Sequence, residues 1–265
     1  MSSPLTRQEL RPGHLRLSDS FTSSRPLLIG YVPLGDPRFS IDILDCYVQG
    51  GVDILEIGLP SLDPYGDGET MANSMRLAAQ AGVNGDAILE LLRPWLTANE
   101  QRPPIVWMCY ADADLTNLEQ WAAEGAVDGI LMLGPPPEGL AELVNGAGLG
   151  LCEFLSWEPS VDEIDRASVA TGYVMVPARP GVTGTDKRPG DPGKLVAQAR
   201  SLNPTAPVVV GFGINDATTA VRLANSGVDG VVVGTACIQA LETEGEEELT
   251  RILSEISSAM RRSEK

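Results

Sequence analysis

Two carboxylic acids, eleven positions apart, are the side chains of this sequence best suited to acid–base chemistry. Glu56 lies within the apolar run 52–59, which is typical of a buried strand, and Asp67 follows in the stretch after it. An acid without a basic neighbour is costly to bury, and burial raises its pKa. Glu56 would then hold a proton near neutral pH, as a general acid must. The alternative is a structural carboxylate with satisfied hydrogen bonds.

Three glycine-rich segments, 180–184, 211–214 and 234–236, follow candidate strands in the last third of the chain. Glycine lets backbone N–H groups approach a ligand closely, and a helix that starts there adds positive partial charge. Barrel enzymes commonly bind a phosphate between their seventh and eighth strands. A single segment of this kind is more often a plain turn, but the three together predict an anion-binding rim that includes Gly211.

The elements that must position these residues follow from the pattern of apolar residues. Candidate strands cover 27–32, 54–59, 105–109, 129–133, 149–155, 172–176, 208–212 and 230–234. Helix-like stretches cover 39–49, 70–81, 86–96, 115–124, 161–169, 194–202, 216–225 and 244–260. Strands separated by helices pair in parallel, and eight such units predict an α/β, single-domain (β/α)8 TIM barrel. A doubly wound open sheet is the alternative, but no GxGxxG follows the first strand.

A weak internal repeat supports the barrel. Segments 51–55, 127–131 and 227–232 each place an Asp between the end of a helix and an apolar strand. Recurrence of one such connection is typical of barrels. We expect residues 1–25 to form a polar, partly ordered N-terminal leader and residues 26–262 to form the barrel catalytic domain. The leader contains His14, the one histidine of the sequence, so we expect no imidazole chemistry in the core.

Composition argues against several classes of partner and site. The net charge of −17 argues against nucleic acid or an anionic membrane as a partner. Four widely spaced cysteines form no CxxC pair, which indicates reduced core residues of a cytoplasmic protein and no metal site. No apolar run is long enough for a signal peptide or a membrane span.

Segments 33–37, 55–68, 181–184 and 211–214 together resemble the tryptophan synthase alpha subunit family, and their order and spacing are specific. The resemblance covers the chain from about residue 26 to residue 260. It implies a TIM barrel that cleaves indole-3-glycerol phosphate to indole and glyceraldehyde 3-phosphate, without a metal or organic cofactor. It also makes a tryptophan synthase beta subunit a candidate partner.

By this resemblance, Glu56 matches the general acid/base carboxylate of the family, and Asp67 matches the acid that hydrogen-bonds the indole nitrogen. The residue types suit the reaction, because a ring carbon must be protonated while positive charge develops on the ring nitrogen. The positions that match the phosphate contacts of the family are Gly184, Gly213, Gly234 and Thr235. We expect the indole-bearing substrate to contact Tyr31, Tyr110, Leu133, Met175, Thr183 and Phe212.

The sequence departs from the family pattern at several positions. Met175 stands where a tyrosine is usual, Asp112 replaces an asparagine, Glu69 a proline and Ser61 an aromatic residue. Residues 134–136 read Gly-Pro-Pro where Asp-x-Pro is usual. Several of these positions belong to loops that, in the family, face the beta subunit. The pattern fits a stand-alone indole-releasing lyase as readily as an ordinary alpha subunit that depends on its partner.

Two other functions compete with the lyase. One is an isomerase or aldolase that forms a lysine Schiff base, which is disfavoured because no lysine lies in a predicted strand. The other is a catalytically silent, alpha-like barrel that only binds and regulates a partner. The presence of both acids counts against that alternative, but fold alone does not decide it.

Overall fold

The strands of this chain close into a barrel. The computed structural model describes residues 12–64, 66–180 and 191–262. All neighbouring strands are parallel and follow chain order, and β1 pairs with both β2 and β8, which closes the sheet. The strands are β1 (Leu27–Val32), β2 (Ile54–Gly58), β3 (Ile105–Cys109), β4 (Gly129–Met132), β5 (Gly150–Phe154), β6 (Val174–Pro177), β7 (Val208–Gly211) and β8 (Gly230–Val233). The prediction of a TIM barrel is confirmed.

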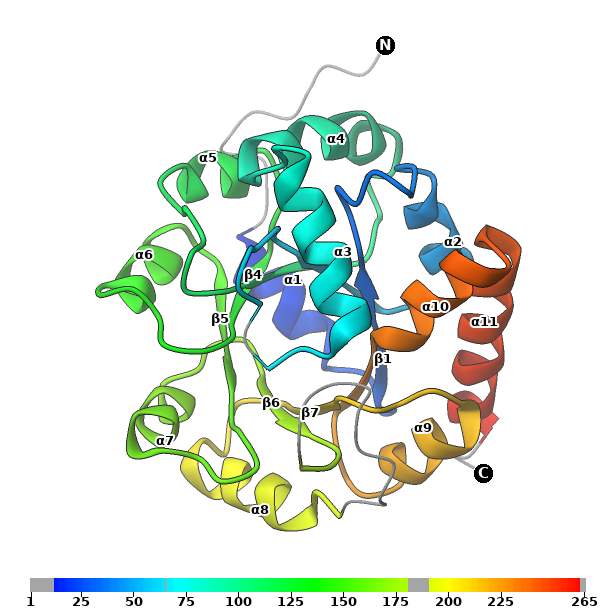
Figure 1. Ribbon diagram of the computed structural model, residues 1–265. Coiled ribbons are helices and arrows are strands. Elements are labelled where there is room, and N and C mark those ends of the chain that lie inside the picture. Colours follow the sequence, from blue (N-terminus) through cyan, green and yellow to red (C-terminus); the bar gives the residue numbers. More distant parts are fainter. Residues whose placement is uncertain (1–11, 65, 181–190, 263–265) are drawn as a thin grey trace.

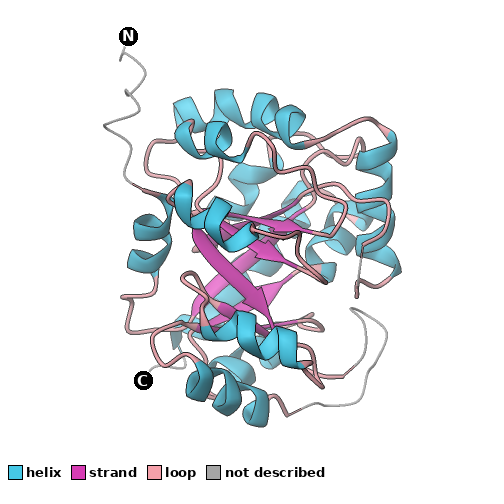
Figure 2. Cartoon of the chain, turned by 90° about the vertical axis from the view of Figure 1, so that its left-hand side faces the viewer, coloured by secondary structure: helices cyan, strands magenta, loops and turns pink. Residues whose placement is uncertain are grey.

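Helices surround the barrel in both views (Figure 1, Figure 2). They are α1 (Gly13–Ser20), α2 (Ile43–Gln49), α3 (Glu69–Gln80), α4 (Gly85–Ala98), α5 (Leu118–Ala123), α6 (Leu140–Gly146), α7 (Val161–Ser168), α8 (Gly193–Leu202), α9 (Ala217–Ala224), α10 (Thr235–Thr243) and α11 (Glu246–Arg262). None of them, within the described ranges, is long and apolar enough to cross a membrane.

The element boundaries agree with the sequence pattern to within a few residues, with four differences. Helices α1, α6 and α10 were not among the predicted stretches. The strand predicted from residue 172 begins at Val174, because the N–H groups of Thr171 and Gly172 both donate to the carbonyl of Leu151 and form a turn there.

Side chains alternate between the barrel interior and the layer beneath the helices. On β1, Leu27, Ile29 and Tyr31 belong to the interior cluster, whereas Leu28 and Val32 pack under the helices. The same alternation on β2 puts Glu56 on the face of Ile54, which also belongs to the interior cluster. The alternation of side chains along β2 therefore points Glu56 into the barrel interior, near the carboxyl end of the strand.

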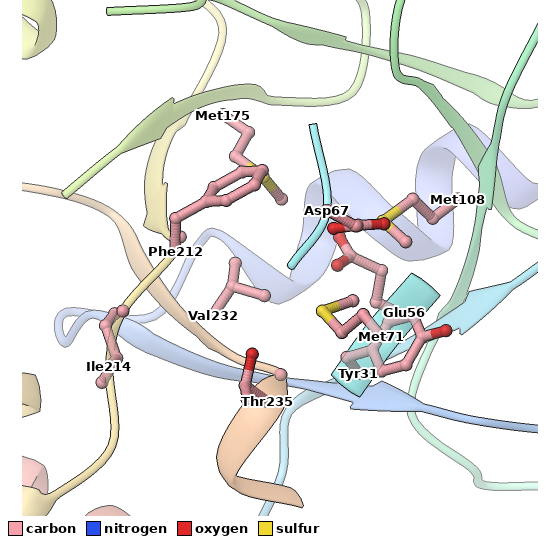
Figure 3. Close-up of a pocket in the computed structure, with 13 residues that line it drawn as sticks. Tyr31, Glu56, Asp67, Met71, Met108, Met175, Phe212, Ile214, Val232 and Thr235 are labelled. Carbon is pink, nitrogen blue, oxygen red and sulfur yellow. The ribbon is translucent and has the colours of Figure 1, made fainter. Parts of the chain in front are cut away.

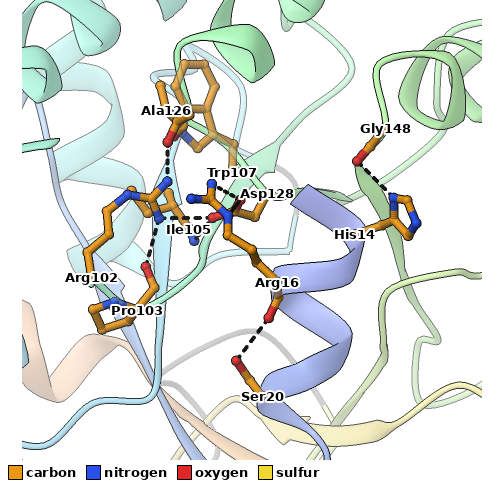
Figure 4. A network of polar contacts seen from close by, with 11 residues as sticks. His14, Arg16, Ser20, Arg102, Pro103, Ile105, Trp107, Ala126, Asp128 and Gly148 are labelled. Atoms are coloured by element: carbon orange, nitrogen blue, oxygen red, sulfur yellow. Dashed lines mark hydrogen bonds and ion pairs between the residues drawn. The ribbon is translucent and has the colours of Figure 1, made fainter. Parts of the chain in front are cut away.

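The N-terminal end of the barrel carries the repeated Asp of the sequence. Asp53, Asp128 and Asp229 each stand just before a strand. Each accepts a hydrogen bond of 2.7–2.8 Å from the backbone N–H of the first or second residue of the strand that comes before that one in the chain. Each also forms an ion pair with an arginine. Asp128 is fully buried between Arg16 and Arg102 (Figure 4). The repeat is thus one connection that fixes strand starts at three places.

Helix α1 closes the N-terminal end and lies within the segment predicted as a leader. Leu17 belongs to the interior cluster and is 1% exposed. A Cβ on Gly13 would lie 2.7 Å from the Cα of Asp128, so only glycine permits this close approach. His14 contacts the carbonyl of Gly148 through Nδ1 at 3.1 Å, far in sequence from either acid of interest (Figure 4). The division into leader and catalytic domain stays a prediction.

Candidate active site

A cavity opens at the carboxyl ends of the strands, the end of a TIM barrel where active sites lie (Figure 3). About 410 Å³ of its space is free of protein atoms, part of it open to solvent. Its lining comes from β1, β2, β3, β6, β7, β8 and the segments that follow them: Tyr31, Glu56, Asp67, Met71, Met108, Met175, Gly211, Phe212, Gly213, Ile214, Val232, Gly234 and Thr235.

Glu56 lies deep in this cavity and is 2% exposed. The hydroxyl of Tyr173 donates a hydrogen bond to its Oε1 at 2.6 Å. Burial raises the pKa of Glu56 to about 7, the hydrogen bond from Tyr173 opposes the rise, and the nearby charge of Asp67 adds to it. Desolvation therefore raises the pKa of Glu56, as the sequence led us to expect. At neutral pH such a group can both give and take a proton.

Asp67 comes from the loop between β2 and α3 and is only half-buried. The hydroxyl of Tyr110, which follows β3, donates a hydrogen bond to its Oδ2. Burial holds the pKa of Tyr110 well above its ordinary value, so this hydroxyl stays a donor. The side chains of Glu56 and Asp67 lie next to one another on the side of the cavity that Met108 and Met71 line (Figure 3). Two carboxyl groups in different environments can divide an acid role from a charge-stabilising role.

Apolar side chains form the walls between the two ends of the cavity. Met71 and Met108 lie on the side of Tyr31, and Met175 and Phe212 lie opposite them (Figure 3). Thioether side chains are flexible and make favourable contacts with aromatic rings. The space between these walls suits a flat aromatic group next to the two acids.

The other end of the cavity is built from backbone. Gly211 and Gly213 follow β7, and Gly234 precedes α10, whose first residue is Thr235. Helix N-termini leave unpaired N–H groups that favour an anion. Phe212 has a φ of 65°, and among the described residues it is the only one besides glycines whose φ is positive. A strained residue at this position indicates a backbone shaped for a purpose other than stability.

Arg179 adds positive charge beside this end. Its guanidinium donates to the carbonyl of Gly213, and a Cβ on Gly213 would lie 2.0 Å from Nη2. Gly213 also has φ of 82°. The backbone conformation therefore favours glycine there, and a larger residue would also displace the guanidinium of Arg179.

The structure brings most of the predicted site residues together, with four exceptions. Tyr110 does not line the cavity but supports Asp67 from behind. Leu133 is buried in the interior cluster and does not line it either. Thr183 and Gly184 lie outside the described residues. The binding roles of all the predicted residues stay predictions.

Sequence reasoning missed Tyr173, Met71, Met108 and Val232 as members of the site. Tyr173 lies two residues before Met175, so the strand period puts both on one face, and that signal was available. Met71 lies one helical turn after Asp67 at the start of α3, which also places it near the acid. The same strand period places Met108 next to Tyr110 on the interior face of β3.

A closed (β/α)8 barrel whose cavity holds a protonatable acid, a second acid and a glycine-rich, backbone-lined end defines a TIM-barrel enzyme of the acid–base class. The family model for the tryptophan synthase alpha chain matches residues 17–264. The chain belongs to the tryptophan synthase alpha chain family. It is a carbon–carbon lyase of tryptophan biosynthesis that cleaves indole-3-glycerol phosphate to indole and glyceraldehyde 3-phosphate.

Individual relatives agree with this assignment. The tryptophan synthase alpha chain of Halorhodospira halophila (strain DSM 244 / SL1) is 34% identical over 237 residues, which is 84% of this chain and 85% of the relative. That of Xylella fastidiosa (strain M12) is 32% identical over 240 residues, 85% of this chain and 89% of the relative. A structure of tryptophan synthase from Mycobacterium tuberculosis superposes with a TM-score of 0.79 at 27% identity and covers 93% of this chain and 98% of that one.

Proposed function

We propose that this chain cleaves indole-3-glycerol phosphate by itself, with Glu56 as the general acid and base and Asp67 as the stabiliser of the ring nitrogen. The observation that carries the proposal is that hydroxyl groups of the same chain already hold both acids. Tyr173 donates to Glu56 and Tyr110 donates to Asp67. A single chain therefore contains the groups that orient its two carboxylates.

The proposed reaction begins with proton transfer from Glu56 to the ring carbon that carries the side chain. The ring nitrogen becomes positively charged, and the carboxylate of Asp67 stabilises it in a water-poor site. A base then removes the proton of the hydroxyl on the adjacent side-chain carbon, which becomes the aldehyde. The electrons of the broken carbon–carbon bond return to the ring and release neutral indole. Ionised Glu56 accepts the hydroxyl proton and is restored.

The phosphate of the substrate would bind at the backbone-lined end, among Gly211, Gly213, Gly234 and the start of α10 at Thr235. The support is the glycine-rich lining at the N-terminus of α10, together with the guanidinium of Arg179 at Gly213, in a chain whose net charge is −17. Local dipoles must overcome that net charge, and they act only at short range. The aromatic ring would then lie between the methionine-lined walls and the two acids.

The loops on the family's partner-facing side bear on the partner, and the cysteines bear on the location. Asp112, Glu69 and residues 134–136 are altered on loops that face the beta subunit in the family, so we propose that the chain needs no beta subunit for activity. The cytoplasm is the proposed location, because all four cysteines are buried free thiols, as expected under reducing conditions.

The test is steady-state release of indole from indole-3-glycerol phosphate by the purified chain, with and without a saturating beta subunit from the same organism. We expect appreciable cleavage by the chain alone and little further activation. Activation by one to two orders of magnitude, which corresponds to a coupling of about 1–3 kcal/mol, would identify an ordinary alpha subunit that depends on its partner.

The phosphate end has its own test. Gly213→Ala should raise KM at least about tenfold and lower kcat less, because the phosphate is remote from the breaking bond. Gly139→Ala is the matched control, since Gly139 has a similar φ of 78° but no atom within 4 Å of its would-be Cβ. An unchanged KM in Gly213→Ala would place the phosphate elsewhere.

A further inference from the structure

The loop between β2 and α3, whose residues 59–64 and 66–68 are described, carries Asp67 and is tied to the end of β3 at more than one point. Its first residue, Leu59, donates its backbone N–H to the carbonyl of Met108 at 2.9 Å. Near its other end, Asp67 accepts the hydrogen bond from Tyr110. The position of Asp67 therefore depends on the segment 108–112.

Asp112 supplies the tie in the middle of the loop. The hydroxyl of Ser61 donates to Oδ1 and Oδ2 of Asp112 at 2.8 and 3.0 Å, and the backbone N–H of Leu62 donates to Oδ2 at 3.1 Å. The hydroxyl oxygen of Ser61 in turn accepts from the N–H of Asp63 at 3.0 Å. Ser61 is 2% exposed, so its hydroxyl has little access to water as an alternative partner.

This arrangement connects two substitutions that the sequence showed separately. Ser61 and Asp112 both depart from the residues usual in the family, and the structure shows that they contact each other. Ser61 could not make these bonds as an aromatic residue, and an asparagine at 112 would offer one acceptor oxygen in place of two. A hydrogen bond to a carboxylate is stronger than one between neutral groups.

We propose that Asp112 and Ser61 are positioning residues that hold the loop 59–68, and with it Asp67, in the arrangement the reaction needs. The proposal rests on the proposed role of Asp67 in cleavage by the single chain. Ordering a loop costs conformational entropy, and a loop tied in advance does not lose it when substrate binds. The tie lies within one chain, so it orders the loop without a partner protein.

The experiment compares Asp112→Ala, Ser61→Ala and the double variant with the wild-type chain. Asp114→Ala is the matched control, because Asp114 is an exposed acid two residues further along the same segment. Its carboxylate accepts hydrogen bonds from the backbone N–H and the hydroxyl of Thr116, within its own turn. Ser61→Thr keeps the hydroxyl and serves as the conservative variant. The measurements are kcat and KM for indole release and hydrogen exchange of the backbone amides of residues 61–63, since residue 64 is a proline and has no N–H.

We expect Asp112→Ala and Ser61→Ala each to lower kcat about tenfold with KM within about twofold, and to speed amide exchange in the loop. The double variant should lose little more than either single one, because both remove the same contact. Ser61→Thr and Asp114→Ala should stay near wild type.

Wild-type kcat with unchanged loop exchange in Asp112→Ala would overturn the proposal, as would losses that add up in the double variant. A wild-type chain that releases no indole by itself contradicts the proposed function instead. The exchange measurement then still decides whether Asp112 and Ser61 hold the loop.

Discussion

The two ends of the barrel both contain buried carboxyl groups, but they pair them differently. At the N-terminal end, Asp128 is surrounded by two guanidinium groups, those of Arg16 and Arg102, and by the N–H of Ile105 (Figure 4). At the C-terminal end, Glu56 has the neutral hydroxyl of Tyr173 as its hydrogen-bond partner. A charge paired with charges serves the structure, whereas a desolvated acid beside a neutral donor can exchange a proton near pH 7.

The comparison teaches that burial of an acid does not by itself indicate its role. Asp128 is less exposed than Glu56, yet it fixes strand starts and the closing helix α1. The chemical type of the partner distinguishes the two cases. Substitutions at the N-terminal end should therefore lower mainly stability, and substitutions at the C-terminal end should lower mainly turnover.

Asp128→Ala should destabilise the fold by about 3–5 kcal/mol, because it leaves two arginines without their buried partner. Turnover per folded molecule should stay near wild type. Asp229→Ala is the control, since its pair with Arg200 is 36% and 40% exposed and its loss should cost about 1–2 kcal/mol. Urea unfolding measures both. Equal costs would show that the buried network is not what holds this end.

The raised pKa of Glu56 should make the free energy of unfolding depend on pH. A Glu in the unfolded chain releases its proton near 4.5, but Glu56 in the folded chain releases it near 7. Between these values the folded state binds the proton more tightly, so stability falls as pH rises through the window. The wild-type chain should lose about 3 kcal/mol relative to Glu56→Gln across it. Unfolding of both proteins at a series of pH values gives the difference, and a flat difference would contradict the raised pKa.

Glu56→Gln should lower turnover at least about 100-fold, because it keeps the shape of the side chain but removes the proton source. Substrate binding should change little. Glu153→Gln is the control, since Glu153 is equally buried but pairs with Arg166 on the outer face of β5. Near-normal turnover in Glu56→Gln would remove this residue from the proposed mechanism.

The smallest effect concerns the neutral donors. The hydrogen bond from Tyr173 lowers the pKa of Glu56, so Tyr173→Phe should raise that pKa further and move the alkaline limb of the kcat/KM profile upward. Tyr110→Phe removes a donor from Asp67 and should leave that limb in place. Kinetics between pH 6 and 9 distinguish the two variants. A downward shift in Tyr173→Phe would mean that its hydroxyl stabilises the protonated acid.

Much of the fold was predictable because it is written in local patterns. Alternation of apolar strands and helices sufficed for a barrel of eight units, and the repeated Asp before three strands marked the connections that the structure shows. Helices α6 and α10 were missed. Helix α6 follows directly on the Gly- and Pro-rich segment 134–139, and α10 begins directly after β8 at Gly234, so neither is set apart by a clear apolar period of its own.

The barrel, the burial of Glu56 and the glycine-rich end of the cavity followed from the sequence alone, because strand period and backbone freedom are properties of neighbouring residues. Only the tertiary structure decided which groups meet. Tyr173 reaches Glu56 across 117 positions, and Asp112 reaches Ser61 across 51. Such contacts depend on strand register and barrel closure, which bring the carboxyl ends of distant strands to one rim. Register is a property of pairs of strands, and no single stretch of sequence contains it.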